Sequence, residues 1–209
     1  MLKYFTNVHP NENFRKNLDL CCGTGTLCNF FKEQAIETKG VDISGGMLAI
    51  ALKNYPGIEF IKHDIIDYHD GEKYDFITCT DDALNHITNT DDIKKIIQNV
   101  NTHLRVDGLF IFDINYFDII PLEKVSKSSD NFKNLSYTPQ REGNIVKINV
   151  EYYENNELLW SDTVCERDYS IEEIAKILND NNFVIEVFSQ YFFDEVRAQK
   201  WKCVARKIE

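Results

Sequence analysis

The chain has 209 residues, of which 43% are hydrophobic and 27% are charged, a composition typical of a folded globular domain rather than of a disordered or fibrous chain. Its 34 acidic residues outnumber 23 basic ones, and the formal net charge of −11 disfavours nucleic acid or an anionic membrane as the main partner. No apolar run approaches the roughly 20 residues of a membrane span, and the first residues lack the apolar stretch of a secretory leader. The six cysteines show no zinc-site or disulfide spacing. We therefore expect a cytoplasmic protein with reduced thiols, no membrane segment and no bound metal.

Strand and helix signals alternate through the first half of the chain. Apolar runs predict five strands, and segments with apolar residues at helical spacing predict three helices between them. The strands are expected at 17–21, 38–43, 58–63, 74–80 and 109–115, and the helices at 26–34, from Ser44 to before Pro56, and at 91–104. Because helical crossovers join neighbouring parallel strands, this order predicts right-handed βαβ units and a parallel sheet.

The pattern changes after the fifth predicted strand. Residues 126–131 are polar and predict a flexible loop. The runs 145–153 and 158–169 alternate in polarity and are separated by a short polar turn, which predicts an antiparallel hairpin. We therefore expect residues 116–167 to form an inserted antiparallel subdomain that shapes the substrate site or its lid.

Residues 168–209 are expected to complete the main domain that residues 1–115 begin. Ser170 and Glu173 have the spacing of a capping box, which predicts the start of a helix. Two strand-forming runs follow this helix, at 183–193 and 201–206.

A glycine pair directly follows the first predicted strand. Gly23 and Gly25 allow a ligand to approach the backbone closely, at the crevice where open α/β sheets bind ligands; the alternative is a tight turn with a structural role only. Asp42 lies 17 residues beyond Gly25, where a carboxylate can accept hydrogen bonds from ribose hydroxyls, unless it caps the next helix. Asp64 ends the third strand and is a candidate acceptor for an exocyclic amine, or else a solvated loop acid. Together these carboxylates predict a nucleoside ligand.

The residues around the turn favour one kind of nucleoside. A pyrophosphate prefers a third glycine and an uncluttered helix N-terminus, whereas Cys28 holds that third position and Asp19 adds negative charge. An anionic phosphate is therefore disfavoured and a cationic ligand is tolerated. The pattern favours a sulfonium nucleoside over NAD, and a nicotinamide-dependent oxidoreductase is kept as an alternative.

The segment LDLCCGTG, residues 18–25, resembles the glycine motif of class I S-adenosylmethionine-dependent methyltransferases. Further segments similar to the family's motifs follow in the expected order, at 40–48, 64–65, 74–79 and 104–113. The match covers 17–115 well and 168–208 loosely. It departs at Cys21, where a small residue is usual, and before the first strand, where only 16 residues stand in place of one or two helices.

The resemblance implies a Rossmann-like, doubly wound seven-stranded sheet, mostly parallel with an antiparallel last strand. It implies S-adenosylmethionine as the cofactor and S-adenosylhomocysteine as the product. The residues in the matching positions would hold the methionine end, the ribose and the adenine of the cofactor, or wall the site near the transferring methyl. They are Asp19, Cys21, Cys22, Gly23, Thr24, Gly25, Asp42, Ile43, Met47, Asp64, Ile65, Cys79, Thr80 and Asp81.

A sulfonium methyl is already activated, so the protein mainly has to hold nucleophile, methyl and sulfur in line. A base is needed only where the acceptor must lose a proton, and His86 is the candidate, against the alternative of a surface histidine. The candidate contacts to the acceptor are Asp82, Asn85, Asn115, Tyr116 and Arg167. We thus predict a methyltransferase acting on an N or O nucleophile of a small metabolite. A non-catalytic nucleoside-binding module, favoured by the short N-terminus, is the other alternative, and the sequence predicts no oligomeric state.

Overall fold

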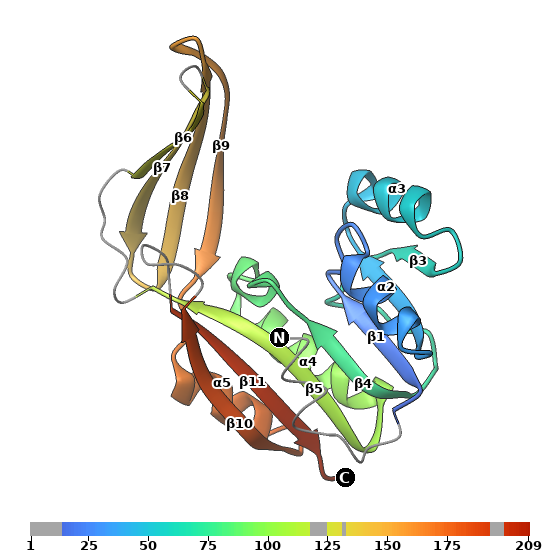
Figure 1. Ribbon diagram of the computed structural model, residues 1–209. Coiled ribbons are helices and arrows are strands. Elements are labelled where there is room, and N and C mark those ends of the chain that lie inside the picture. Colours follow the sequence, from blue (N-terminus) through green and yellow to red (C-terminus); the bar gives the residue numbers. More distant parts are fainter. Residues whose placement is uncertain (1–13, 118–124, 131–132, 193–198) are drawn as a thin grey trace.

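The computed structural model describes residues 14–117, 125–130, 133–192 and 199–209, and these residues form two sheets (Figure 1). The larger sheet has seven strands in the order β10-β11-β5-β4-β1-β2-β3. Their bounds are β1 (Lys16–Leu20), β2 (Glu37–Asp42), β3 (Glu59–Lys62), β4 (Tyr74–Cys79), β5 (Leu104–Tyr116), β10 (Phe183–Phe192) and β11 (Gln199–Lys207). Strand β11 runs antiparallel to both of its neighbours, β5 and β10, whereas β1 to β5 pair in parallel. The expected mostly parallel sheet with an antiparallel last strand is confirmed.

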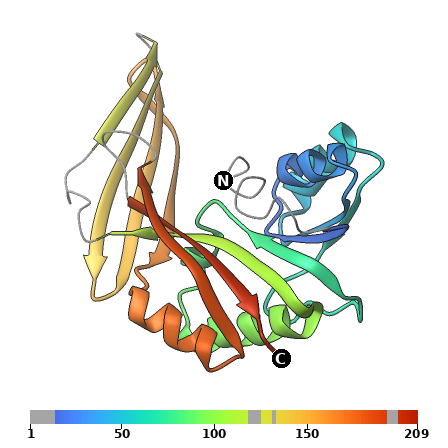
Figure 2. The same ribbon diagram turned by 60° about the horizontal axis from the view of Figure 1, so that its bottom comes forward.

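Helices cover both faces of this sheet, as Figure 2 shows for α4 and α5 on one side and for α2 and α3 away from them. Their bounds are α2 (Thr26–Glu33), α3 (Gly45–Asn54), α4 (Thr90–His103) and α5 (Ile171–Asn179), and a 3-10 turn, η1 (Ala83–His86), follows β4. On the α4 and α5 face, Ile97 and Leu178 pack with Phe110 in one buried cluster. On the other face the rings of Phe31 and Phe76 meet edge to face, with centroids 4.9 Å apart.

The helix starts follow from local side-chain chemistry. Ser44, as predicted, caps α3 by accepting a hydrogen bond from the backbone N–H of Met47 at 3.3 Å. Ser170 caps α5 in the same way, accepting from the backbone N–H of Glu173 at 3.1 Å. The Glu173 carboxylate accepts from the Arg167 guanidinium, so the structure shows the Ser170 half of the predicted capping box.

The smaller sheet is antiparallel throughout, in the order β6-β7-β8-β9. Its strands are β6 (Val125–Asp130), β7 (Lys133–Glu142), β8 (Ile145–Glu154) and β9 (Glu157–Arg167). The predicted hairpin is present as β8 and β9. In Figure 1 this sheet rises from the end of the larger one where β5 finishes, and β9 leads back into α5. The division of the chain at 116–167 and the role of this segment as substrate subdomain or lid stay predictions.

One prediction about this sheet is wrong. Residues 126–130, expected to belong to a flexible loop, form most of β6, which pairs with β7 through partners such as Ser126 with Ser136. The polar sequence is typical of an edge strand, where charged residues discourage further pairing, and β6 is the edge strand of this sheet. Strand β7 was not predicted because Pro139 interrupts its sequence. Pro139 pairs with Ile148 of β8, and the β6 pairing that the structure describes ends at Tyr137, so the missing N–H of Pro139 interrupts none of the described pairs with β6.

In the part of the chain that the structure describes, no helix is long and apolar enough to cross a membrane.

Candidate functional site

The turn after β1 bends around its two glycines. Gly23 and Gly25 have φ angles of 55° and 77°, in the left-handed region that glycine adopts readily. Cys21 is also left-handed, at φ 55°, and Thr24 lies half-buried between the glycines. A Cβ atom added at Gly23 would meet no atom within 4 Å. Space is therefore open in front of the backbone at this turn.

Asp42 ends β2 beside the turn and holds it in place. Its Oδ2 accepts a hydrogen bond from the backbone N–H of Gly23 at 2.8 Å, and its Oδ1 accepts from that of Ser44 at 2.8 Å. A carboxylate has about four acceptor positions, so each oxygen can accept one more hydrogen bond. Asp42 can thus fix the turn and still accept hydrogen bonds from two hydroxyl groups of a ligand.

Asp19 lies under the same turn and is almost completely buried. Its carboxylate accepts hydrogen bonds from the Thr78 hydroxyl at 2.6 Å and from the Cys28 thiol at 3.4 Å. Burial raises the pKa of Asp19 to about 7, although these two donors act against the rise. Near neutral pH, Asp19 is therefore partly protonated in the absence of a ligand, and the predicted negative charge is only partly present.

We expect Asp19→Asn to stabilise the unliganded protein at about pH 8 and to have a smaller effect near pH 4. An acid whose pKa is raised in the folded state favours folding while protonated, and this contribution is lost as pH rises through the folded pKa. Each pKa unit corresponds to about 1.4 kcal/mol of unfolding free energy. Even a third of the shift of Asp19, from 3.8 to about 7, is therefore measurable. Urea unfolding at several pH values measures the difference from wild type. An equal difference at all pH values would contradict the prediction, and the exposed Asp67→Asn is the control.

Exposed apolar side chains flank the end of β2. Ile43 is 65% exposed and Met47 is 46% exposed, both beside Asp42. Asp64, at the end of β3, uses Oδ1 to accept from the backbone N–H of Ile66 at 3.0 Å, which leaves its other oxygen for a ligand. Ile65 is buried in the core cluster, so its side chain does not face this surface. The loop ends of β2 and β3 thus offer exposed apolar surface at Ile43 and Met47 and one carboxylate oxygen at Asp64.

The cysteines of the turn form a buried floor. The Cys79 thiol lies fully buried against the Cys21 thiol, and this contact and burial raise the pKa of Cys79 well above its usual value. Contact with the Cys22 thiol and burial raise the pKa of Cys28 in the same way. The Cys79 and Cys28 thiols are therefore neutral. Cys79, which we expected to wall the site near the transferring methyl, is fully buried.

Polar residues follow β4, the strand next to β1 in the sheet. Thr80 is half-buried, and Asp81 is exposed and paired with Lys200 at 3.2 Å. Asp82 accepts from the Lys200 ammonium at 2.5 Å through Oδ1 and from the Asn115 amide at 2.8 Å through Oδ2. Its backbone N–H donates to the Asp113 carboxylate at 2.6 Å. Burial nevertheless raises the pKa of Asp82, against the effect of Lys200.

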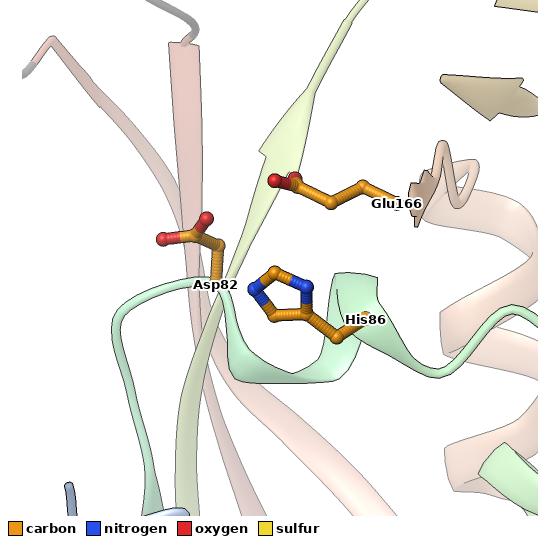
Figure 3. A group of neighbouring side chains, drawn as sticks. All are labelled: Asp82, His86 and Glu166. Atoms are coloured by element: carbon orange, nitrogen blue, oxygen red, sulfur yellow. The ribbon is translucent and has the colours of Figure 1, made fainter. Parts of the chain in front are cut away.

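Three side chains that can bind or move a proton meet at this point (Figure 3). One atom each of Asp82, His86 and Glu166 lies within 4.8 Å of the other two. His86 comes from η1 and is exposed, whereas Glu166 comes from β9 and is 5% exposed. Burial and then the charge of Asp82 raise the pKa of Glu166. Sequence reasoning missed Glu166. The alternation along β9 does not show which of its side chains meets the residues that follow β4 in the larger sheet.

The other predicted acceptor contacts are placed differently. Asn85 is fully buried; its amide N–H groups donate to the backbone carbonyls of Asn115 and Arg167, and its Oδ1 accepts from the Asn115 N–H. It holds the ends of β5 and β9 together. The Arg167 side chain turns to α5, where it pairs with Glu173 at 3.0 Å. Asn115 donates to both Asp82 and Glu166, and Tyr116 ends β5 with a side chain outside the described residues.

Comparison with known proteins adds to this geometry. The family model described as a methyltransferase domain matches residues 18–108. The dTDP-4-amino-2,3,4,6-tetradeoxy-D-glucose N,N-dimethyltransferase of Saccharopolyspora spinosa is 29% identical over 100 residues, which are 48% of this chain and only 40% of the relative's length. A solved S-adenosylmethionine-dependent methyltransferase from Clostridium acetobutylicum ATCC 824 is similar with a TM-score of 0.87 and 25% identity, over 99% of this chain and 89% of that one. An amino pentose methyltransferase from Micromonospora echinaspora shares the fold, with a TM-score of 0.82 at 16% identity over 98% of this chain and 87% of that one.

Proposed function

The chain belongs to the class I S-adenosylmethionine-dependent methyltransferases, and on this premise we propose that it transfers a methyl group from S-adenosylmethionine to a nitrogen atom of a small molecule. The observation that carries the proposal is the pairing of two sites at one edge of the sheet. The open turn at Gly23 lies beside Asp42 at the ends of β1 and β2, and the cluster of Asp82, His86 and Glu166 lies at the ends of β4 and β5. Ligands of open α/β sheets bind at this edge.

The residues of the first site fit the cofactor. Asp42 keeps acceptor positions for the two ribose hydroxyls, and the space in front of Gly23 receives the methionine part. Ile43 and Met47 offer apolar surface to the adenine, while Asp64 accepts from its exocyclic amine. The cofactor supplies a sulfonium methyl that needs no further activation, so the protein has to position it and exclude water.

The residues of the second site suit an amine acceptor. An amine is protonated near neutral pH and must lose one proton before its lone pair can form a bond to carbon. His86 can take this proton, and the neighbouring Asp82 and Glu166 stabilise the imidazolium. The N–C bond then forms as the C–S bond breaks, which gives a methylated ammonium and neutral S-adenosylhomocysteine. His86 is exposed and can return its proton to water. The printed names of the relatives, which methylate amino sugars, support nitrogen as the acceptor atom.

Calorimetric titration tests the cofactor assignment. We expect wild-type protein to bind S-adenosylmethionine and S-adenosylhomocysteine, and Asp42→Ala to weaken both by about tenfold or more, equivalent to about 1.4 kcal/mol. The exposed Asp67→Ala is the matched control, and thermal unfolding shows whether each variant is folded.

The alternatives give different results. Binding of NAD in place of S-adenosylmethionine would overturn the proposal in favour of an oxidoreductase. Cofactor binding without methyl transfer to any amine would overturn it in favour of a non-catalytic module.

A further inference from the structure

One face of the smaller sheet begins at Glu166 and carries mostly apolar side chains along β8 and β9. Residues paired directly across antiparallel strands point to the same face. The register of β8 and β9 therefore places four pairs on the Glu166 face: Val146 with Glu166, Ile148 with Val164, Val150 with Asp162, and Tyr152 with Trp160. Among these pairs, the exposed Asp162 is the one charged residue besides Glu166. Exposure rises along this face, from the buried Val146 through the half-buried Ile148 to Trp160, which is 50% exposed. We call the apolar residues of these pairs the apolar strip, which consists of Val146, Ile148, Val150, Tyr152, Trp160 and Val164.

The opposite face of the same sheet is polar. Its residues line a shallow hollow, and they are Thr138, Gln140, Lys147, Asn149, Glu151 and Thr163. The two faces thus differ in chemistry although both come from the same strands. Glu166 fixes which face continues from the catalytic cluster, because its carboxylate lies beside Asp82 and His86 (Figure 3).

The cluster at the base of the apolar strip carries an excess of negative charge. Glu166 is buried and Asp82 is half-buried, and burial and then the charge of Asp82 raise the pKa of Glu166. One amide group, that of Asn115, donates to both carboxylates, at 2.8 Å to Asp82 and at 3.2 Å to Glu166. The Lys200 ammonium is within 2.5 Å of Asp82. A second cation beside Glu166 would remove the remaining repulsion.

We propose that Glu166 and the apolar strip select the acceptor, which is an amine carried on an apolar or planar body. Its ammonium group is held by Glu166 and Asp82, next to His86, and its body lies on the strip toward Tyr152 and Trp160. This inference rests on the proposed function and names the substrate class of the same site. Continuity of the strip with the acidic cluster carries it, because one ligand can contact both only if it is cationic at one end and apolar at the other.

A divalent metal ion is the competing occupant of the cluster, since aspartate, histidine and glutamate are all metal ligands. Each oxygen of Asp82 already accepts one hydrogen bond, from Lys200 or from Asn115, and keeps one further acceptor position. An N–H of an ammonium group can use such a position with both donors in place, and the Mn²⁺ titration below tests the metal ion.

The test measures binding of simple probes to the full chain saturated with S-adenosylhomocysteine. 2-Phenylethylamine has both features, 2-phenylethanol lacks the ammonium group, and ethanolamine lacks the apolar body. We expect 2-phenylethylamine to bind at least about tenfold more tightly than either. Equal binding of the alcohol, equal binding of ethanolamine, or no binding of 2-phenylethylamine would overturn the inference.

Two variants locate the contacts. Glu166→Gln is expected to weaken 2-phenylethylamine about tenfold or more and to leave S-adenosylhomocysteine binding unchanged. Trp160→Ala is expected to weaken 2-phenylethylamine but not ethanolamine. Glu151→Gln, on the opposite face, is the matched control. Unchanged amine affinity in Glu166→Gln would overturn the inference, as would Mn²⁺ binding that Glu166→Gln abolishes. Failure of the wild-type protein to bind S-adenosylhomocysteine would instead overturn the proposed function itself.

Discussion

Replacement of His86 by alanine is expected to slow methyl transfer about 10²- to 10⁴-fold, the range of a lost general base. The His86 ring lies beside Asp82 and Glu166, where it can take the proton of an ammonium group. It is exposed and lies outside the core clusters, so its removal leaves the fold and the cofactor turn intact. Single-turnover transfer from labelled S-adenosylmethionine gives the rate, and calorimetry is expected to show cofactor affinity within about twofold of wild type.

The pH dependence separates a base from a residue that only shapes the site. The difference in methyl-transfer rate between wild type and His86→Ala is expected to shrink as pH rises, because the acceptor amine then loses its proton to water without help. His69→Ala is the control, since His69 is an exposed histidine whose ring contacts His103 rather than this cluster. A deficit that stays constant with pH, or wild-type rates in His86→Ala, would contradict the role of His86 as the base.

The parts of the fold that depend on neighbours in sequence could be predicted. The strand before Gly23, the cap at Ser44 and the order of strands and helices all follow from short-range patterns. The position of Asp42 beside Gly23 follows too, because parallel neighbouring strands bring their carboxyl ends together.

The acceptor side depended on contacts between distant segments. Glu166 reaches Asp82 only because Asn85 ties the end of β9 to that of β5, and no local pattern reports such a bond. Arg167, the next residue, necessarily points to the other face of its strand and pairs with Glu173. A strand's alternation gives two candidate faces, and the docking of the smaller sheet on β5 decides between them. For that reason Arg167 could be predicted at this site while its neighbour was missed.

Gly25→Ala is expected to destabilise the protein by about 3 kcal/mol, combining the left-handed backbone with overpacking. A Cβ atom at Gly25 would lie 2.5 Å from Cζ of Phe60 and 3.2 Å from the Cβ atom of Ala51. The Phe60 ring also lies against Gly40, because its Cδ1 and Cε1 atoms are 2.7 Å and 2.9 Å from where a Cβ atom of Gly40 would stand. The ring is thus held between two glycines, and each glycine is needed for its packing.

Gly23→Ala is the matched comparison, because its φ is also left-handed but its Cβ atom would meet nothing within 4 Å. We expect it to destabilise the unliganded protein by only about 1 kcal/mol, from backbone conformation alone. The added methyl group would instead stand in the space assigned to the methionine part of the cofactor and weaken its binding about tenfold or more. Urea unfolding and calorimetry separate the two effects. Equal unfolding midpoints for Gly25→Ala and Gly23→Ala would show that Phe60 does not restrict Gly25, and unchanged cofactor affinity in Gly23→Ala would place the methionine part elsewhere.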